Sequence, residues 1–322
     1  MARIKANSFI AALFLLILAT ACNRQKAGTS DNLSGDLVIF HAGSLSVPLK
    51  EIADSFMVLN PGIQVKAESA GSLASIRKIT DLNRSCDILA SADYSLIDKL
   101  MIPAHASWNL QFAGNEMAIV YQKESLKSEI INRENWYSIL LEPDIKYGRS
   151  DPDSDPCGYR TILSLKLAEE YYRLPGLAGR FIKKDENYIR PKEVDLLALF
   201  ESGTIDYIFI YKSVAIQHKL PFLELPDSFN LGNPLLKDHY AKVDVKVAGN
   251  KPGEYITLKG EPMVYGLTIP DNCEHFPAAK TFVAYLLTKG RKIIEKSGQT
   301  NVNPILSGDP DKLPENLKPL LK

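Results

Sequence analysis

The sequence predicts an α/β protein with two lobes, each a mainly parallel sheet flanked by helices. From residue 36 onward, short apolar runs typical of buried strands alternate with segments of helical periodicity. The same alternation starts again in the middle of the chain. The length of 322 residues is also enough for two lobes that bury a core. Sheets of this kind bind ligands at the loops that follow the carboxyl ends of their strands.

The first half of the chain contains four apolar runs that we interpret as strands, with an amphipathic helix after each of the first three. The first helix carries Leu45, Leu49 and Ile52 on one face, and Pro61-Gly62 follows its end. The strands are expected at residues 37–40, 63–65, 86–90 and 117–121, and the third helix at 94–101.

The second half repeats this pattern. A loop at 150–160 separates an expected strand at 145–148 from a helix, and Ser202-Gly203 ends a further helix at 192–201. Two more strands are expected at 207–211 and 264–269, before two final helices. The chain is therefore expected to leave the first lobe near residue 115 and to return near 261. This assigns residues 36–114 and 261–322 to lobe I, and residues 115–260 to lobe II.

The N-terminus has the features of a secretory signal. Arg3 and Lys5 precede an apolar run at 9–19, which is shorter than the ~20 residues of a membrane-spanning helix. Residues 18–22 resemble a bacterial lipobox, with alanine where leucine is usual three places before the cysteine. We expect a lipoprotein signal at 1–22, lipid attachment at Cys22 and a flexible tether at 23–35. The alternative is an ordinary secretory signal with an incidental cysteine.

Charge and cysteine content exclude some function classes. The 38 basic residues balance 38 acidic ones, whereas a nucleic-acid-binding protein normally has a basic excess. Neutrality is compatible with an anion site, because backbone N–H groups can hold an anion without arginine. Cys86, Cys157 and Cys273 lack zinc-site spacing, and each is interpreted as a small buried side chain. One disulfide among them is possible, but its partners are not assigned.

Two serines stand where an expected strand passes into a helix. Ser44 follows Gly43, and Ser72 follows Gly71. Glycine lets a ligand approach the backbone closely, and hydroxyl and helix-terminal N–H groups are donors. Either serine alone is explained by helix capping. Two of them after adjacent strands favour a shared anion site.

Three other residues are candidates with equally simple structural explanations. Asp155 precedes Pro156 at the start of a helix, a common capping arrangement. Glu193 lies in the first turn of its helix, where the helix dipole favours a carboxylate. Tyr211 ends an apolar strand and is compatible with a core aromatic residue. By themselves these positions identify no function.

Five segments occur in the same order as in a known family. They are His41-Ala42-Gly43-Ser44-Leu45-Ser46, Ala70-Gly71-Ser72, Ala90-Ser91-Ala92-Asp93-Tyr94, Asp155-Pro156-Cys157-Gly158-Tyr159-Arg160 and Tyr211-Lys212-Ser213-Val214-Ala215. With them the chain resembles, from residue 36 to about 305, the archaeal-type branch of the tungstate/molybdate-binding proteins of ABC importers. The resemblance implies a two-lobed periplasmic-binding-protein fold of the class II type, with the anion in the cleft. It also implies a protein that delivers molybdate or tungstate to a membrane permease, and we expect a monomer without a cofactor. The lipobox-like N-terminus places it on the periplasmic side of a bacterial envelope.

The resemblance also implies the site residues. The bound metal would be six-coordinate, with four oxo ligands and two protein carboxylates, which map onto Asp155 and Glu193. The hydrogen bonds to the oxyanion would come from Ser44, Ser72, Cys157 and Tyr211. Because the loop also contains Asp151 and Asp153, the choice of aspartate stays open. The preference between molybdate and tungstate stays open as well.

A secreted serine hydrolase is the rival from another class, with His41, Ser44 and an aspartate as a triad. The sequence has neither a Gly-x-Ser-x-Gly elbow nor a His-Glu-x-x-His motif. His41 ends a buried strand, which favours a structural histidine. We therefore expect no enzymatic activity.

A second rival keeps the fold and changes the ligand to sulfate, phosphate, a polyamine or ferric iron. Ferric sites often use clustered tyrosines, and Tyr171-Tyr172 is such a pair. Its place in an amphipathic helix favours packing instead.

Overall fold

The computed structural model describes residues 33–184, 186–249 and 253–321. The expected signal, Cys22 and most of the expected tether lie outside these residues. Gly35, the last residue of the expected tether, begins strand β1 (Gly35–His41). Its N–H donates to the carbonyl of Gly62 at 3.0 Å, so the backbone is already paired there.

The first sheet has six strands in the order β13-β4-β12-β3-β1-β2. β1, β2, β3 and β4 run in one direction, and β12 and β13 run in the other. The bounds of the remaining strands are β2 (Ile63–Ser69), β3 (Ile88–Ser91), β4 (Trp108–Gly114), β12 (Val264–Thr268) and β13 (Thr300–Gly308).

The second sheet has five strands in the order β7-β6-β8-β5-β9. Only β5 runs against the others. The bounds are β5 (Met117–Tyr121), β6 (Tyr147–Ser150), β7 (Ile189–Arg190), β8 (Tyr207–Tyr211) and β9 (Phe222–Glu224). A separate hairpin joins β10 (Asp244–Ala248) to β11 (Tyr255–Lys259).

Both sheets insert one antiparallel strand at the same place. β12 lies between β3 and β4, and β5 lies between β8 and β9. Each inserted strand directly follows a crossing of the chain from one sheet to the other. The first crossing comes after Gly114 and leads into β5, and the second comes before Val264 and leads into β12. The sheets and the helices that flank them form the two lobes predicted from the sequence.

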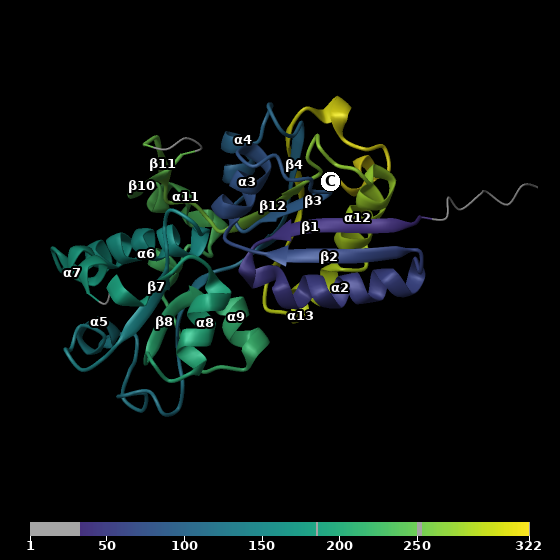
Figure 1. Ribbon diagram of the computed structural model, residues 1–322. Helices are drawn as coiled ribbons and strands as arrows, with labels where there is room; N and C mark the ends of the chain where they lie inside the picture. Colours follow the sequence, from purple (N-terminus) through teal and green to yellow (C-terminus); the bar gives the residue numbers. More distant parts are fainter. Residues whose placement is uncertain (1–32, 185, 250–252, 322) are drawn as a thin grey trace, which may run out of the picture. The chain divides into compact units, whose positions relative to one another are not determined.

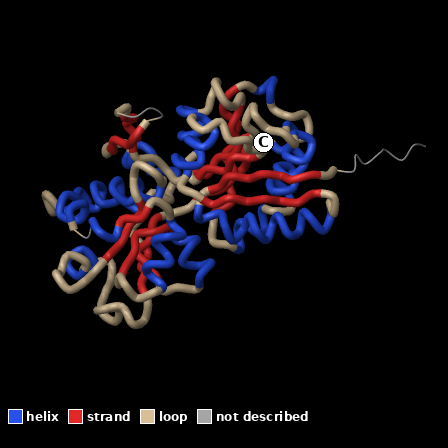
Figure 2. Tube along the Cα trace, viewed as in Figure 1, coloured by secondary structure: helices blue, strands red, loops and turns tan. Residues whose placement is uncertain are grey.

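Helices cover both faces of each sheet, as Figures 1 and 2 show. In the first lobe α2, α12 and α13 pack together on one face, and α3 and α4 cover the other. These helices are α2 (Ser46–Leu59), α3 (Ser72–Thr80), α4 (Tyr94–Leu100), α12 (Phe276–Thr288) and α13 (Arg291–Lys296). Single 3-10 turns lie at Gly43–Leu45 (η1), Pro310–Lys312 (η4) and Lys318–Leu320 (η5).

In the second lobe α6, α7 and α10 pack together, while α8 and α9 contact the strands separately from them. The bounds are α5 (Trp136–Ile139), α6 (Pro156–Tyr172), α7 (Leu177–Lys183), α8 (Glu193–Glu201), α9 (Lys212–His218), α10 (Asp227–Asn230) and α11 (Lys237–Tyr240). Two 3-10 turns, η2 (Glu186–Tyr188) and η3 (Pro234–Leu236), lie between these helices.

Aromatic side chains join the layers of each lobe. Phe56 of α2 meets Phe282 of α12 edge to face, with ring centroids 5.1 Å apart. In the second lobe Trp136 packs against Phe181 and Phe209, at centroid distances of 5.3 and 5.7 Å. Such edge-to-face and tilted pairs stabilise a core beyond the area that they bury. No helix within the described ranges is long and apolar enough to cross a membrane.

Candidate ligand-binding site

The candidate residues lie where strands end and helices begin. Ser44 lies in η1, directly after β1, and Ser72 is the first residue of α3, which follows β2. On the second lobe the residues are Asp155 before α6, Cys157 within α6, Glu193 at the start of α8 and Tyr211 at the end of β8. All six side chains are buried. Both sheets thus direct their carboxyl-terminal loops toward this region, as expected for α/β sheets.

Asp155 connects the N-termini of two helices. It caps α6, and Pro156 occupies the first helical position, where proline is pre-organised. Its Oδ1 accepts from the N–H of Cys157 at 3.0 Å, and its Oδ2 accepts from the N–H of Glu193 at 3.2 Å. Burial raises the pKa of Asp155 to about 6, although these two hydrogen bonds oppose the shift. The carboxyl group is therefore fixed in position but is poorly stabilised as an anion.

The other two aspartates of the loop have local roles. Asp151 accepts from the N–H of Asp153 at 3.0 Å and from the hydroxyl of Ser154 at 3.0 Å. Asp153 accepts from the N–H of Ala248 at 2.8 Å. Neither is fully buried. The geometry thus favours Asp155 among the three.

Glu193 is an unusual group in a folded interior. Its side chain is 2% exposed, and neither carboxylate oxygen has a hydrogen-bond partner. Burial, and then the neighbouring Asp155 carboxylate, raise the pKa of Glu193 well above its usual range. The N–H of Ser44 and the thiol of Cys157 are close enough to oppose this shift, without reaching hydrogen-bond geometry. A buried carboxylate without partners destabilises a fold, so its presence indicates a functional position.

The two glycines that precede the candidate serines press against the second lobe. A Cβ added at Gly43 would lie 2.7 Å from Oε2 of Glu193. A Cβ added at Gly71 would lie 2.2 Å from the carbonyl oxygen of Ser154 and 3.0 Å from the Cβ of Asp155. Glycine is required at Gly71, where the added atom would meet backbone, and at Gly43 a larger residue would displace the Glu193 side chain.

Ser44 is held by a chain of hydrogen bonds with a fixed direction. The amide of Asn115 donates to the hydroxyl oxygen of Tyr265 at 2.7 Å. Tyr265 in turn donates to the hydroxyl oxygen of Ser44 at 2.9 Å. Because an amide nitrogen can only donate, the Tyr265 proton must point to Ser44, and the Ser44 proton must point elsewhere.

Ser72 and Tyr211 are held in the same way. The hydroxyl oxygen of Ser72 accepts from the N–H of Ala92 at 2.9 Å. The hydroxyl oxygen of Tyr211 accepts from Nη1 of Arg160 at 3.3 Å. Among the described residues, none of the three hydroxyls of Ser44, Ser72 and Tyr211 donates to a protein acceptor. All three protons are therefore available to a ligand.

Cys157 differs from these hydroxyls. Its N–H donates to Asp155, and its thiol lies 3.7 Å from the carbonyl oxygen of Phe209. Both of its donors already have acceptors. Burial raises the pKa of the thiol well above its usual range. Cys86, Cys157 and Cys273 are free thiols in the described structure.

The residues of the rival hypotheses are placed differently. The Nδ1 of His41 lies 2.9 Å from the carbonyl oxygen of Ala42, so this nitrogen does not pair with Ser44. Burial lowers the pKa of His41, as expected for a structural histidine. The Tyr172 hydroxyl donates to the carbonyl of Arg133, and the Tyr171 ring packs against Phe229. The tyrosine pair therefore has a packing role.

Sequence patterns indicated no role for Tyr265, Asn115 or Arg160. Arg160 belongs to the Asp155–Arg160 segment, one of the five segments of the family resemblance, and this could have marked it as a candidate. Asn115 and Tyr265 lie at the two chain crossings, and only the folded structure brings them to Ser44.

Comparison with known proteins identifies the family of the chain. The sequence matches the family of bacterial extracellular solute-binding proteins over residues 37–300. The chain belongs to this family. Membership implies a location outside the cytoplasm.

The relatives of this solute-binding protein match it over nearly its whole length. A solute-binding protein of Petrotoga mobilis is 46% identical, with 91% of this chain and 92% of the relative aligned. The molybdate/tungstate-binding protein WtpA of Thermococcus kodakarensis is 35% identical, with 97% and 95% aligned. The periplasmic molybdate-binding protein of Azotobacter vinelandii has a similar structure, with a TM-score of 0.62 over 82% of this chain and 98% of that one. At 16% sequence identity, this last likeness concerns the fold alone.

Proposed function

We propose that this solute-binding protein captures molybdate or tungstate outside the cytoplasm and delivers it to the permease of an ABC importer. The relative from Thermococcus kodakarensis, whose name is molybdate/tungstate-binding protein, aligns over 97% of the chain. The anion would lie between the lobes, bound by residues from both.

The observation that carries the proposal is the state of three buried hydroxyls. The oxygens of Ser44, Ser72 and Tyr211 each accept from a fixed protein donor, so their protons remain for the ligand. An oxyanion accepts hydrogen bonds and donates none when fully ionised. Donors that are oriented before the ligand arrives favour such an anion at a low entropic cost.

The buried carboxylates decide which oxyanion fits. Asp155 and Glu193 would repel a dianion if they only faced its oxygens. Their presence becomes favourable when each oxygen binds the high-valent metal directly. Sulfate and phosphate cannot expand their coordination in this way. The carboxylate pair therefore supports molybdate or tungstate over the smaller oxyanions.

The rival functions lack a comparable observation. Ferric iron would suit oxygen ligands, yet it gives no reason for three hydroxyls whose oxygens already accept hydrogen bonds. Serine hydrolysis would need a base at Ser44, whose hydroxyl oxygen accepts from Tyr265 while His41 Nδ1 faces a carbonyl. We infer that the protein is not an enzyme and that its ligand leaves unchanged.

Calorimetry of the anion-free protein tests the proposal. Molybdate, tungstate, sulfate, phosphate and ferric citrate are titrated in turn. Molybdate and tungstate should bind tightly, and the other three should bind at least a hundredfold more weakly or not at all. A sulfate affinity within about tenfold of the molybdate affinity, roughly 1.4 kcal/mol, would contradict it.

We also propose that the protein is a periplasm-facing lipoprotein of a bacterial envelope and acts as a monomer. The basic, apolar and small residues before Cys22 support the lipid anchor. Replacing Cys22 with serine should abolish labelling with a radioactive fatty acid and release the protein from the membrane fraction. Unchanged labelling would leave the anchor without support. Light scattering with and without molybdate measures the mass, which should stay that of one chain.

A further inference from the structure

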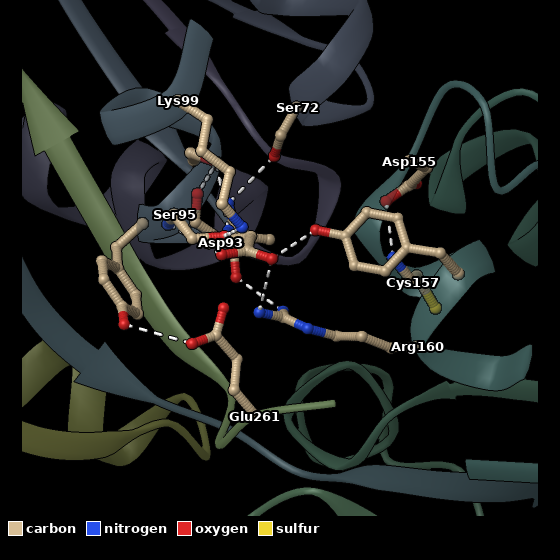
Figure 3. Close-up of polar contacts among 12 residues, drawn as sticks. Ser72, Asp93, Ser95, Lys99, Asp155, Cys157, Arg160 and Glu261 are labelled. Atoms are coloured by element: carbon tan, nitrogen blue, oxygen red, sulfur yellow. Dashed lines mark hydrogen bonds and ion pairs between the residues drawn. The ribbon is translucent and has the colours of Figure 1, made fainter. Parts of the chain in front are cut away.

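A buried ionic cluster joins the two lobes beside the candidate site. Asp93 caps α4 in the first lobe, and its Oδ1 accepts from the N–H of Ser95 at 2.9 Å. Its Oδ2 accepts from the hydroxyl of Tyr159 and lies 3.4 Å from Nη2 of Arg160, both of the second lobe. Figure 3 shows Arg160 reaching from α6 to Asp93. All three side chains are buried, with 1–3% exposed.

The same guanidinium also touches both halves of the candidate site. Nη1 of Arg160 donates to the carbonyl oxygen of Ala92 at 2.6 Å and to the Tyr211 hydroxyl at 3.3 Å. The N–H of the same residue, Ala92, donates to the hydroxyl oxygen of Ser72. One arginine thus connects Ser72 of the first lobe with Tyr211 of the second.

We propose that Arg160 is a positioning residue that couples anion recognition to closure of the lobes. Asp93, Tyr159 and Arg160, here named the Asp93 latch, hold the closed form, and Arg160 orients the Ser72 and Tyr211 hydroxyls within it. The proposal rests on the proposed function, because it concerns the release of the same anion.

The physical reason lies in where the contacts are made. Every contact of Tyr159 and Arg160 with Asp93 or Ala92 crosses from one lobe to the other, so opening the cleft breaks all of them. Once open, the charged groups return to water. The latch therefore acts on the closed state, which governs how slowly the anion leaves, more than on the initial encounter.

Two conservative variants each weaken the latch without changing a residue that is proposed to bind the anion. Tyr159→Phe removes one hydroxyl, and Asp93→Asn removes a charge while keeping a good helix cap for α4. Tyr207→Phe is the matched control, because its buried hydroxyl donates to Leu126 at 2.6 Å within the second lobe alone. Release of radioactive molybdate into excess tungstate gives the dissociation rate, and small-angle X-ray scattering gives the compaction on binding.

The expected result separates the latch from general stability. Tyr159→Phe and Asp93→Asn should each speed release by about tenfold, with association changed less than threefold. The double variant should release molybdate only slightly faster than either single variant, because both substitutions remove the same contact. Tyr207→Phe should lower the melting temperature while release stays as in the wild type. Arg160→Lys should speed release like the latch variants. Because it also loses the contact with Tyr211, it should in addition slow the association of molybdate.

Other outcomes would overturn the inference. If the wild type binds molybdate and compacts, but both latch variants release molybdate at the wild-type rate, the inference about the latch is wrong and the proposed function stands. If all variants, including Tyr207→Phe, speed release equally, the residues have only a structural role. A wild type that neither binds molybdate nor compacts would overturn the proposed function, and the latch with it.

Discussion

Gly43 and Glu193 belong to opposite lobes, and a Cβ added to Gly43 would lie 2.7 Å from the Oε2 of Glu193. A methyl group at that distance would force the Glu193 side chain to move. Gly43 does not have a positive φ, so alanine can adopt its backbone conformation. The cost of Gly43→Ala should therefore fall on closure and not on the fold of the first lobe.

We expect Gly43→Ala to weaken molybdate binding by tenfold or more while the melting temperature of the anion-free protein changes little. Gly179→Ala is the control, because nothing lies within 4 Å of an added Cβ there. Calorimetry and thermal unfolding of both variants check the prediction. Equal affinities for Gly43→Ala and the wild type would mean that the lobes need not approach this closely.

Glu193→Gln should change affinity and stability in opposite directions. The variant removes an ionisable group that folding must either bury as a charge or protonate, so the anion-free protein should melt at least about 2 °C higher, which corresponds to about 1 kcal/mol. Molybdate affinity should fall by tenfold or more, about 1.4 kcal/mol. Asp195→Asn, a partly exposed carboxylate in the same first turn, is the control for the helix dipole. Higher stability together with tighter binding would mean that Glu193 only repels the anion.

Tyr265→Phe tests the direction of the hydrogen-bond chain at Ser44. Without the Tyr265 hydroxyl the Ser44 proton is free to rotate, and Asn115 loses an acceptor. Affinity for molybdate should fall about five- to tenfold, roughly 1 kcal/mol. Tyr240→Phe removes a buried hydroxyl that donates to Asp227 at 2.6 Å in the second lobe, and its affinity should match the wild type. An equal loss in both variants would indicate a general packing effect.

Asp87 predicts a dependence of stability on pH. Burial alone would raise its pKa, but hydrogen bonds from the N–H groups of Val38 and His275 and from the Cys273 thiol, with the nearby His275 imidazole, together lower it. Its folded pKa therefore lies below the unfolded value of about 3.9, so its contribution is present above that pH and is lost as the pH falls through the folded pKa. Asp87→Asn should lower the melting temperature at pH 7 and flatten its fall between about pH 5 and pH 2. Asp144→Asn, at an exposed position, controls for the loss of one negative charge, and an equal change of the curve in both variants would contradict this role for Asp87.

The fold could be predicted largely because buried parallel strands carry a strong local signal. The apolar runs at 37–40 and 207–211 became β1 and β8, and the expected crossing near 115 falls between Gly114 and Met117. The strand expected at 145–148 lies two residues further on, at Tyr147–Ser150. β13 (Thr300–Gly308) was not predicted, because a mostly polar edge strand with an internal proline has little pattern of its own.

The candidate site could be predicted where chemistry and local structure coincide. Asp155 marks a helix start, and Ser44 and Ser72 follow glycines in strand-to-helix loops. Tyr265 and Asn115 could not be found this way. A tyrosine in a strand and an asparagine at a chain crossing have no local signature, and their function exists only through contacts that span 150 residues or more.

X-ray absorption at the molybdenum edge of the molybdate complex tests most directly whether Asp155 and Glu193 bind the metal. We expect a six-coordinate centre, with two metal–oxygen distances longer than those of the oxo shell. Each of Asp155→Asn and Glu193→Gln should remove one of the longer distances and weaken binding. A four-coordinate spectrum in the wild type, with equal or tighter binding by the two amide variants, would contradict the account.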